Sequence, residues 1–332
     1  MKALILAAGF GTRLAPITDT LPKPLVPIIN VPVIMYNIAL LKSVGIEEIY
    51  INVHHGAEKI MDKLENGKKL GISITWLVEK EILGTGGAIG ALKGLVDETI
   101  LVINADTIMD VDIESMIDQH RASKRIVTLG LLKAPKHDAR SVVTCNDNGQ
   151  IVRMIDSYIT DNIPEGNAIF SGVHLIEPAL LEYIPPTIYR SITTHIYTRI
   201  IQESIEIGGY FFTGDWWDIG TPEAYLACHY ELMDRGFLSF FNPIRSDATN
   251  QTAENSHLIV LDDKMKLPVV PLHPPLIVGS GVKVKAVDSL GPYLIAGKGV
   301  TISKEKETSH AVYLAHADGT KYITAQNGII YY

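Results

Sequence analysis

Short apolar runs alternate with helical patterns between residues 2 and 107 of this chain. Ala3–Ala8 and Thr99–Asn104 are apolar and bounded by turn residues, as buried strands are. Pro32–Val44 has helical periodicity and ends at Gly45. This alternation predicts an α/β domain with a Rossmann-like, mixed, mostly parallel sheet and helices on both faces. Ligands bind such sheets at the carboxyl ends of the strands, so functional residues are expected there.

The other elements of this domain are expected at shorter intervals. Further strands are predicted at Ile49–Val53, Ile72–Val78, Ile126–Leu132, Ser141–Cys145 and Ala168–Ile176, and further helices at Glu58–Leu64, Gly87–Leu95, Asp112–Ser123, Pro178–Tyr183 and Thr193–Ile205. Asp147-Asn148-Gly149 lies between two apolar stretches and predicts a hairpin turn. We place the end of the domain near residue 240.

An internal repeat marks a second region. Val278–Val284 matches Ala296–Ile302 at an offset of 18 residues. Three hexapeptides make one coil of a left-handed parallel β-helix, so this offset would stack the two segments directly. Residues 241–270 are expected to form a linker and residues 271–332 a short left-handed β-helix that ends in a hairpin. Solenoids need about three repeats for stability, so a tail with two clear rungs is expected to lean on the large domain or on another subunit, which favours a homo-oligomer.

Length and charge limit the classes of protein to consider. The chain has 332 residues, enough for one large domain and a small appendage. Its net charge of −8 argues against nucleic acid as a partner, although a small site can still hold phosphate with a few cations and backbone N–H groups. The first apolar run is too short to span a membrane, so no membrane partner and a cytoplasmic location are expected.

The two cysteines support the same interpretation. Cys145 and Cys228 are the only cysteines, and their spacing fits neither a zinc site nor a disulfide framework. We expect two reduced thiols.

A glycine-rich loop, Leu6-Ala-Ala8-Gly9-Phe-Gly11-Thr12-Arg13, follows the first predicted strand. Gly9 and Gly11 allow the backbone to turn tightly and to approach a phosphate. Arg13 is placed where a guanidinium could clamp phosphate oxygens. Lys23 lies between two prolines, each of which fixes its own φ, and a lysine in so stiff a frame suits stabilisation of a departing pyrophosphate.

The two glycines by themselves also allow simpler interpretations of this loop. Two glycines after a strand can form an ordinary tight turn. A dinucleotide-binding loop would need a third glycine where this chain has Leu14, and no Walker A lysine follows.

The longer pattern is more specific. Gly9–Thr18, with the letters GFGTRLAPIT, and Pro22–Pro27, with PKPLVP, resemble the signature of the sugar-1-phosphate nucleotidylyltransferases. The nearest members are the mannose-1-phosphate guanylyltransferases and the N-acetylmuramate-1-phosphate uridylyltransferases, and the resemblance covers about residues 1–240. It implies an enzyme that joins an NTP and a sugar 1-phosphate to give an NDP-sugar and pyrophosphate. It also implies the following nucleotide-binding residues: Leu6, Ala8, Gly9, Gly11, Thr12, Arg13 and Lys23.

Two aspartates match the family's metal ligands. Asp106 directly follows a predicted strand, and Asp218 lies in a WDIGT segment that resembles the second metal-binding motif of the family. Mg²⁺ takes one or two carboxylates together with substrate phosphate oxygens, so the resemblance implies a Mg²⁺ cofactor held by this pair. Either aspartate alone is as well explained as a turn residue or a helix cap. Asp110 and Asp112 are expected at the start of the next helix.

The segments for base and sugar are less uniform. Leu83–Ala88 resembles the family's base-binding LGTAG segment, which assigns Gly84, Thr85 and Gly86 to the nucleotide, although a glycine-rich helix start is the simpler alternative. The family's Glu-Lys-Pro triplet is missing, with Arg153 as the candidate substitute for its lysine. Phe170 replaces an expected asparagine in a segment similar to the muramate-type enzymes. Gly172, Asp218 and Arg153 are the implied sugar-phosphate residues.

The resemblance favours a mannose-1-phosphate guanylyltransferase-like enzyme. The alternatives are a uridylyltransferase acting on a hexose or N-acetylmuramate 1-phosphate, and a catalytically silent regulatory subunit that binds a nucleotide sugar. A cytidylyltransferase acting on a non-sugar phosphate is disfavoured by the WDIGT segment and the tail. An acyltransferase is disfavoured because two rungs cannot build the usual site between subunits.

Overall fold

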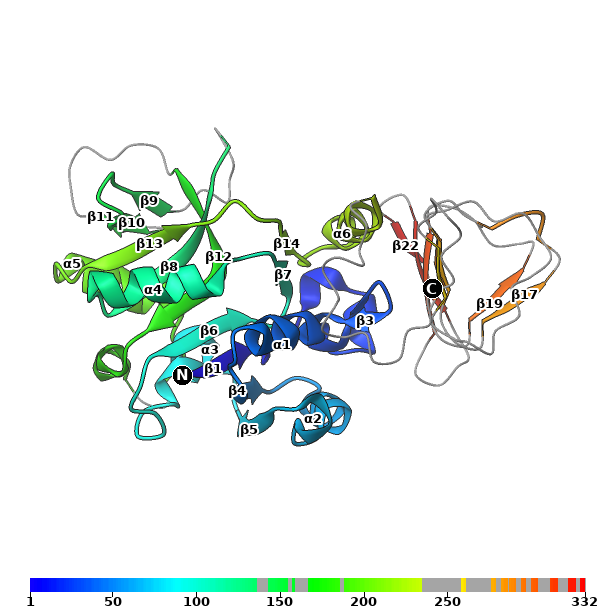
Figure 1. The fold of residues 1–332 in the computed structure, drawn as a ribbon. Coiled ribbons are helices and arrows are strands. Elements are labelled where there is room, and N and C mark those ends of the chain that lie inside the picture. Colours follow the sequence, from blue (N-terminus) through cyan, green and yellow to red (C-terminus); the bar gives the residue numbers. More distant parts are fainter. Residues whose placement is uncertain are drawn as a thin grey trace. The chain divides into compact units, whose positions relative to one another are not determined.

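The computed structural model of the chain describes most of residues 1–234 and short segments of the tail (Figure 1). The described residues are 1–135, 143–154, 157–158, 167–185, 188–234, 258–260, 276–278, 282–285, 287–290, 294–296, 300–303, 311–315, 322–326 and 329–331. The chain divides into two compact units. The first contains Met1–Phe10 and Tyr36–Trp216, and the second contains Gly11–Met35 and Trp217–Tyr332.

A parallel set of strands forms one half of the sheet in the first unit. In spatial order it consists of β6 (Ile100–Asn104), β1 (Lys2–Leu6), β4 (Glu48–Val53) and β5 (Ser73–Val78). The central residues of β1 and β6 are fully buried, as expected for strands covered on both faces. The predicted strands of this half are therefore confirmed, and their carboxyl ends meet at one edge.

The other half of the sheet is mainly antiparallel. β12 (Ala168–Ile176) pairs with β6 and is followed in spatial order by β9 (Val143–Cys145), β10 (Ile151–Met154) and β11 (Ser157–Tyr158). β12 also pairs with β8 (Val127–Lys133), and β13 (Ile207–Phe211) pairs in parallel with the other edge of β8. β9 and β10 form the predicted hairpin, with Gly149 at φ 70. Ser141, at the start of one predicted strand, lies outside the described residues. The sheet is mixed, as predicted.

The remaining elements of residues 1–234 are short strands and helices. The α-helices are α1 (Val33–Ser43), α2 (Ala57–Leu64), α3 (Gly84–Gly90), α4 (Ile113–Ser123), α5 (Thr198–Gln202) and α6 (Pro222–Asp234). The 3₁₀-helices are η1 (Thr12–Leu14), η2 (Ile17–Asp19), η3 (Lys23–Leu25), η4 (Lys68–Leu70) and η5 (Pro178–Tyr183), η6 (Ile192–Tyr197) is a π-helix, and the short strands are β2 (Pro27–Ile28), β3 (Val31–Pro32), β7 (Thr107–Met109) and β14 (Trp216–Asp218).

Two helix predictions need correction. The helix predicted at Gly87–Leu95 begins at Gly84 and ends at Gly90, because its first turn is hydrogen-bonded to the distant backbone of Arg190. The helix predicted at Thr193–Ile205 is a π-helix followed by the short α5 and ends at Gln202. The differences in the bounds arise at helix ends, where periodicity carries the least information, whereas the π-helical hydrogen bonding of η6 runs through the first half of the second helix.

Helices lie on both faces of the sheet in the first unit. One hydrophobic cluster joins Leu4 and Leu129 of the sheet to Ile89 of α3. Thr128 precedes Leu129 in β8 and therefore points to the other face, where its hydroxyl is hydrogen-bonded to His120 of α4 at 2.7 Å. Figure 1 shows α4 lying across β8 and β13. The predicted two-sided packing is confirmed.

The tail is built from strands stacked in parallel. They are β15 (Leu258–Val260), β16 (Leu276–Val278), β18 (Leu294–Ala296) and β20 (Ala311–Ala315), with β17 (Lys283–Lys285) and β19 (Thr301–Ser303) as a second parallel pair. Leu276 pairs with Leu294, so the predicted offset of 18 residues is confirmed. β15 adds a strand inside the segment predicted to be a linker, and the left-handed winding of the tail stays a prediction.

The end of the tail is a hairpin, as predicted. β20 pairs antiparallel with β21 (Tyr322–Gln326), which pairs with β22 (Ile329–Tyr331). In the same compact unit, the Asn30 side chain in the turn between β2 and β3 donates a hydrogen bond to the Ala296 carbonyl at 3.2 Å. Within the described part of the chain, no helix combines the length and the apolar character that crossing a membrane requires.

Candidate active site

The glycine-rich loop starts at the carboxyl edge of the parallel strands. Leu6 is the last residue of β1, and its carbonyl accepts a hydrogen bond from the Ala105 N–H at 3.0 Å. The Ala7 N–H donates to Asn52 Oδ1 at 2.9 Å, and Ala8 is buried. A Cβ on Gly9 would meet no described protein atom within 4 Å, which leaves the Gly9 backbone uncovered on that side. The loop thus emerges where the fold type binds ligands.

The second part of the loop belongs to the other compact unit and is tightly folded. Gly11 has φ 69, and its carbonyl accepts hydrogen bonds from the Leu14 N–H and the Thr18 hydroxyl, both at 2.9 Å. A Cβ on Gly11 would lie 3.0 Å from Thr18 Cγ2 and 3.1 Å from Lys23 Cβ. Gly11 is therefore required both for the left-handed backbone and for the close approach of Lys23.

Lys23 and its neighbours combine stiffness with charge. Lys23 is buried, with 8% of its surface exposed, and it begins the 3₁₀-helix η3, which follows Pro22 and contains Pro24. Thr12 and Arg13 are exposed in η1. Two exposed loop residues and one rigidly held lysine stand within one short segment, as phosphate binding would require.

Gly220 brings Arg13 and Asp218 together in the second unit. A Cβ on Gly220 would lie 3.2 Å from Arg13 Nη2 and 3.3 Å from both carboxylate oxygens of Asp218. The glycine of the WDIGT segment therefore leaves room for a guanidinium and a carboxylate to face the same point. Arg13 and Asp218 are about 205 positions apart in the chain, so this is a tertiary arrangement and not a local motif.

Asp106 lies in the first unit, just beyond the carboxyl end of β6, and is half-buried. Asp112 is the N-cap of α4 and accepts hydrogen bonds from the Ser115 N–H at 2.9 Å and the Ser115 hydroxyl at 2.6 Å. These bonds lower the pKa of Asp112 below its usual value. The prediction that Asp112 marks a helix start is confirmed.

Carboxylates are the candidate metal ligands in both compact units. Over the described residues, no group of three or more His, Cys, Asp or Glu side chains is placed to hold a metal ion. Asp106 of the first unit and Asp218 of the second are half-buried carboxylates next to strand ends, and carboxylate oxygens are the ligand type that Mg²⁺ prefers. Cys145 and Cys228 are free thiols, and burial raises the pKa of Cys145 to about 11.

The segment that resembles the base-binding motif is held by residues far along the chain. The Gly86 N–H donates to the Arg190 carbonyl at 2.8 Å, and the Arg190 N–H donates to the Leu83 carbonyl at 2.9 Å. Gly84 has φ 69, and a Cβ there would lie 2.6 Å from the Arg190 carbonyl oxygen. The Ile192 N–H donates to the Thr85 hydroxyl at 2.9 Å. The glycines therefore serve close backbone packing, and the Gly86 N–H is engaged within the chain.

Gly172 also has a packing reason. It has φ 87 and lies where the pairing of β12 with β8 shifts register, and a Cβ would lie 2.4 Å from Asn104 Nδ2. The Trp216 indole N–H donates to the Ser171 carbonyl at 2.9 Å. Arg153 lies in β10, opposite Thr144 of β9. The structure thus places Gly172 beside the end of β6 and Arg153 further along the sheet, in a different strand.

Two buried polar residues were not picked out as site residues by the sequence patterns. Asn52 is 4% exposed and Glu79 is 8% exposed, and they are hydrogen-bonded to each other at 2.7 Å. Asn52 could have been found as the one amide side chain in the apolar strand Ile49–Val53. Its partner at the end of β5 could not have been identified without the fold.

Comparisons with known proteins give several matches to the chain. A family model described as "Nucleotidyl transferase" matches residues 2–235. The chain is 32% identical over 267 residues to "Probable mannose-1-phosphate guanylyltransferase 2" of Oryza sativa subsp. japonica, covering 78% of this chain and 70% of that protein. It is 30% identical to "UTP--glucose-1-phosphate uridylyltransferase" of Synechocystis sp., covering 68% of this chain and 61% of that protein.

A solved structure shows the same fold. The crystal structure of HddC from Yersinia pseudotuberculosis complexed with GMP-PN superposes with a TM-score of 0.58 and 21% sequence identity. The match covers 70% of this chain and 99% of that chain. At this level of identity the likeness concerns the fold.

Proposed function

Because the chain belongs to the nucleotidyl transferase family, we propose that it joins GTP and mannose 1-phosphate to give GDP-mannose and pyrophosphate. The general reaction, transfer of a nucleotidyl group from an NTP to a sugar 1-phosphate, accords with the family and with the named relatives. The choice of guanine and mannose follows the 32% identical relative from Oryza sativa. A uridylyltransferase is the second candidate, favoured by the 30% identical relative from Synechocystis.

The observation that carries this proposal is the approach of Arg13 and Asp218 at Gly220. It links the glycine-rich loop to the WDIGT segment, two sequence motifs that would otherwise be unrelated. An anion-binding guanidinium next to a carboxylate able to hold a cation is the pairing that a metal-bound triphosphate needs.

The proposed reaction is an in-line displacement at the α-phosphorus of the NTP. A phosphate oxygen of the sugar 1-phosphate forms the new P–O bond, and the bond to the β-phosphate oxygen breaks, which releases pyrophosphate. The nucleophile is already anionic, so no general base is needed and the work consists of positioning and charge stabilisation. Gly9, Gly11 and Thr12 would hold the triphosphate, and Arg13 with Lys23 would stabilise the leaving pyrophosphate.

Further roles complete the proposed site. Leu6 and Ala8 would line the nucleotide, Gly84, Thr85 and Gly86 would lie along the base, and Gly172 with Arg153 would contact the sugar phosphate. Asp106 and Asp218 would hold a Mg²⁺ ion, which when bound offsets the negative charge of the reacting phosphate groups. Asp218 would also lie near the sugar phosphate.

The domain division remains part of the proposal. Residues 1–240 would form the catalytic domain, 241–270 a linker and 271–332 the β-helix tail. The match of the family model to residues 2–235 supports the first boundary. A homo-oligomer formed through the tail is proposed because stacked strands leave open ends.

Replacing Asp106 tests the metal assignment. Asp106→Asn keeps the shape of the side chain but removes its charge, so Mg²⁺-dependent pyrophosphate release is expected to fall at least about a hundredfold. The matched control is Asp110→Asn, which changes an exposed aspartate four positions away and is expected to keep wild-type turnover. Circular dichroism would show that both variants fold. Full activity in Asp106→Asn would refute the role of Asp106.

A further inference from the structure

A buried chain of hydrogen bonds joins the two glycine-rich segments inside the first unit. The Ala7 N–H donates to Asn52 Oδ1 at 2.9 Å, and Asn52 Nδ2 donates to Glu79 Oε1 at 2.7 Å. The Leu83 N–H donates to Glu79 Oε2 at 2.8 Å. Ala7 lies at the start of the glycine-rich loop, called the phosphate loop below, and Leu83 precedes Gly84 of α3. Each segment is therefore joined to the Asn52–Glu79 pair by one hydrogen bond.

The direction of each hydrogen bond follows from chemistry. A backbone N–H can only donate and a carboxylate can only accept, so the Asn52 amide must turn its oxygen toward Ala7 and its nitrogen toward Glu79. No other orientation of the amide satisfies both neighbours. Both side chains are more than nine-tenths buried, so water replaces neither bond easily.

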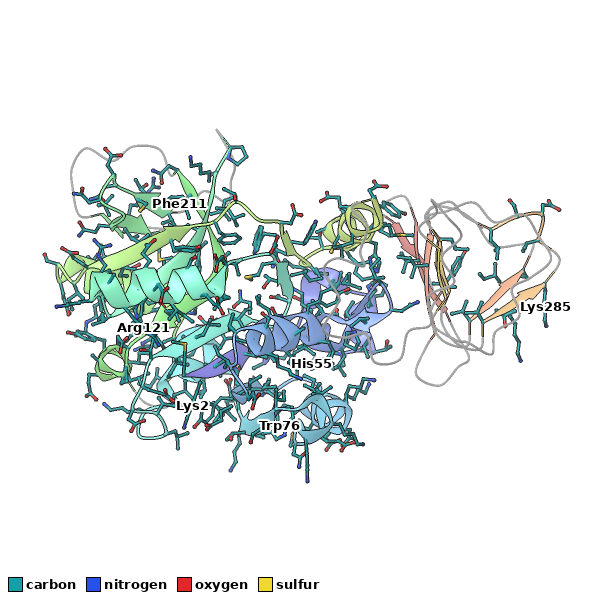
Figure 2. All side chains as sticks on the ribbon, in the orientation of Figure 1. Lys2, His55, Trp76, Arg121, Phe211 and Lys285 are labelled. Carbon is teal, nitrogen blue, oxygen red and sulfur yellow. The ribbon has the colours of Figure 1, made fainter. Side chains whose placement is uncertain are left out.

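A second tie runs through the aromatic residue of the loop. The Phe10 ring contacts the rings of His54 and His55, with centroids 5.6 and 5.7 Å apart (His55 is labelled in Figure 2). His54 Nδ1 is hydrogen-bonded to the Glu79 carbonyl oxygen at 2.9 Å. Phe10 lies between Gly9 and Gly11. The exposed part of the glycine-rich loop is therefore connected to Glu79 through His54, as the buried start of the loop is connected to it through Asn52.

We infer that Asn52 and Glu79 are positioning residues that set the distance between the phosphate loop and the α3 glycine segment. This inference rests on the proposed function, in which the first segment holds the triphosphate and the second lies along the base. A nucleotide that spans both segments makes its full set of contacts only if the separation of the segments matches the distance between its base and its triphosphate, because a mismatch costs contacts or ordering entropy. The pair therefore acts on nucleotide affinity through the two segments to which its hydrogen bonds run.

Reversing the polarity of the pair tests the inference. In Asn52→Asp the two facing carboxylates repel. In Glu79→Gln one of the three contacts of the pair, with Ala7, between the two side chains or with Leu83, must set a donor against a donor. The double variant restores every bond, since the new carboxylate accepts from Ala7 and from the new amide, whose oxygen still accepts from Leu83. Each single variant is expected to raise the Kd for Mg²⁺-GTP about tenfold, and the double variant to lie within about threefold of wild type.

A hydrogen bond elsewhere in the sheet provides the control. The Thr99 hydroxyl donates to Glu177 Oε1 at 2.7 Å, and Thr99 immediately precedes β6, at the strand end away from both loops. Thr99→Val is expected to lower the unfolding midpoint but to leave the Kd for Mg²⁺-GTP unchanged. If a single variant does not fold, the nucleotide affinity of the double variant alone decides.

The outcomes separate this inference from the proposed function. Binding of Mg²⁺-GTP and Mg²⁺-UTP is measured first for the wild type. If the wild type binds neither nucleotide, the proposed function is contradicted. With nucleotide bound by the wild type, unchanged affinity in both single variants would overturn the positioning role. A double variant that binds Mg²⁺-GTP as weakly as the single variants would also overturn the positioning role, because the restored hydrogen bonds would then not restore nucleotide affinity.

Discussion

At the scale of single residues, Gly220 is the most informative position in the second unit. A methyl group there would lie 3.2 Å from Arg13 Nη2 and 3.3 Å from the Asp218 oxygens. Gly220→Ala should therefore displace both groups by a few tenths of an ångström and lower kcat/KM about tenfold, with little change in the free energy of unfolding. Pyrophosphate release and thermal unfolding measure the two quantities.

The control for this variant is Gly94→Ala. Gly94 has φ 80, and a Cβ there would meet no described atom within 4 Å. Its substitution should cost about 1 kcal/mol of stability through backbone strain and leave kcat/KM unchanged. Gly220→Ala with wild-type kcat/KM would show that the space at Gly220 has no bearing on the site.

Single residues were predictable where a motif is contiguous. Gly9, Gly11 and Arg13 follow one strand within a few positions, and each could be assigned a role from its type and its neighbours. The pairing of Asn52 with Glu79 was not predictable, because it depends on two strands that pair in parallel at the same edge. A hydrogen-bonded pair from different strands leaves no periodic signal in the sequence.

At the scale of elements, the first turn of α3 depends on the backbone of Arg190. Gly84 has φ 69 and would place a Cβ 2.6 Å from the Arg190 carbonyl oxygen. Gly84→Ala should therefore destabilise the chain by about 2–4 kcal/mol and weaken nucleotide binding, since both the backbone strain and the clash oppose the native turn. Chemical denaturation measures the first effect and nucleotide titration the second.

Gly45→Ala is the matched control for the turn. Gly45 has φ 72, but a Cβ added there would meet no described atom within 4 Å, so this variant shares the strain without the clash. It should lose only about 1 kcal/mol. Equal losses in the two variants would show that contact with Arg190 does not hold the turn.

The elements themselves were predictable to the extent that their apolar periodicity is local. β1, β4 and β6 are buried runs bounded by turns, and their predicted positions agree with the structure. The helix start at Leu83–Ala88, one of the two interpretations of that segment, is confirmed, whereas the π-helical η6 was not foreseen. The start of α3 is set by hydrogen bonds between segments more than one hundred positions apart, which intrinsic propensity does not encode.

At the scale of the whole molecule, the sequence contained two kinds of repeat, and both were informative. Strand–helix alternation predicted the sheet, and the offset of 18 residues predicted the stacking of β16 on β18. β15 was missed because the sequence after it, Leu261-Asp-Asp263, lacks the Gly-x-Gly pattern found at Gly279–Gly281 and Gly297–Gly299. Short strands of this kind become recognisable once a neighbour with the same register is known.

The central claim, nucleotidyl transfer from GTP to mannose 1-phosphate, is tested most directly by identifying the product. The purified chain is incubated with Mg²⁺ and each combination of GTP, UTP, CTP, ATP and dTTP with mannose, glucose and N-acetylmuramate 1-phosphates, and nucleotide sugars are identified by mass spectrometry alongside released pyrophosphate. We predict GDP-mannose, formed with the highest kcat/KM of all pairs. Formation of no GDP-mannose, or of another nucleotide sugar with a higher kcat/KM, by a folded protein that binds Mg²⁺-GTP, would contradict the claim.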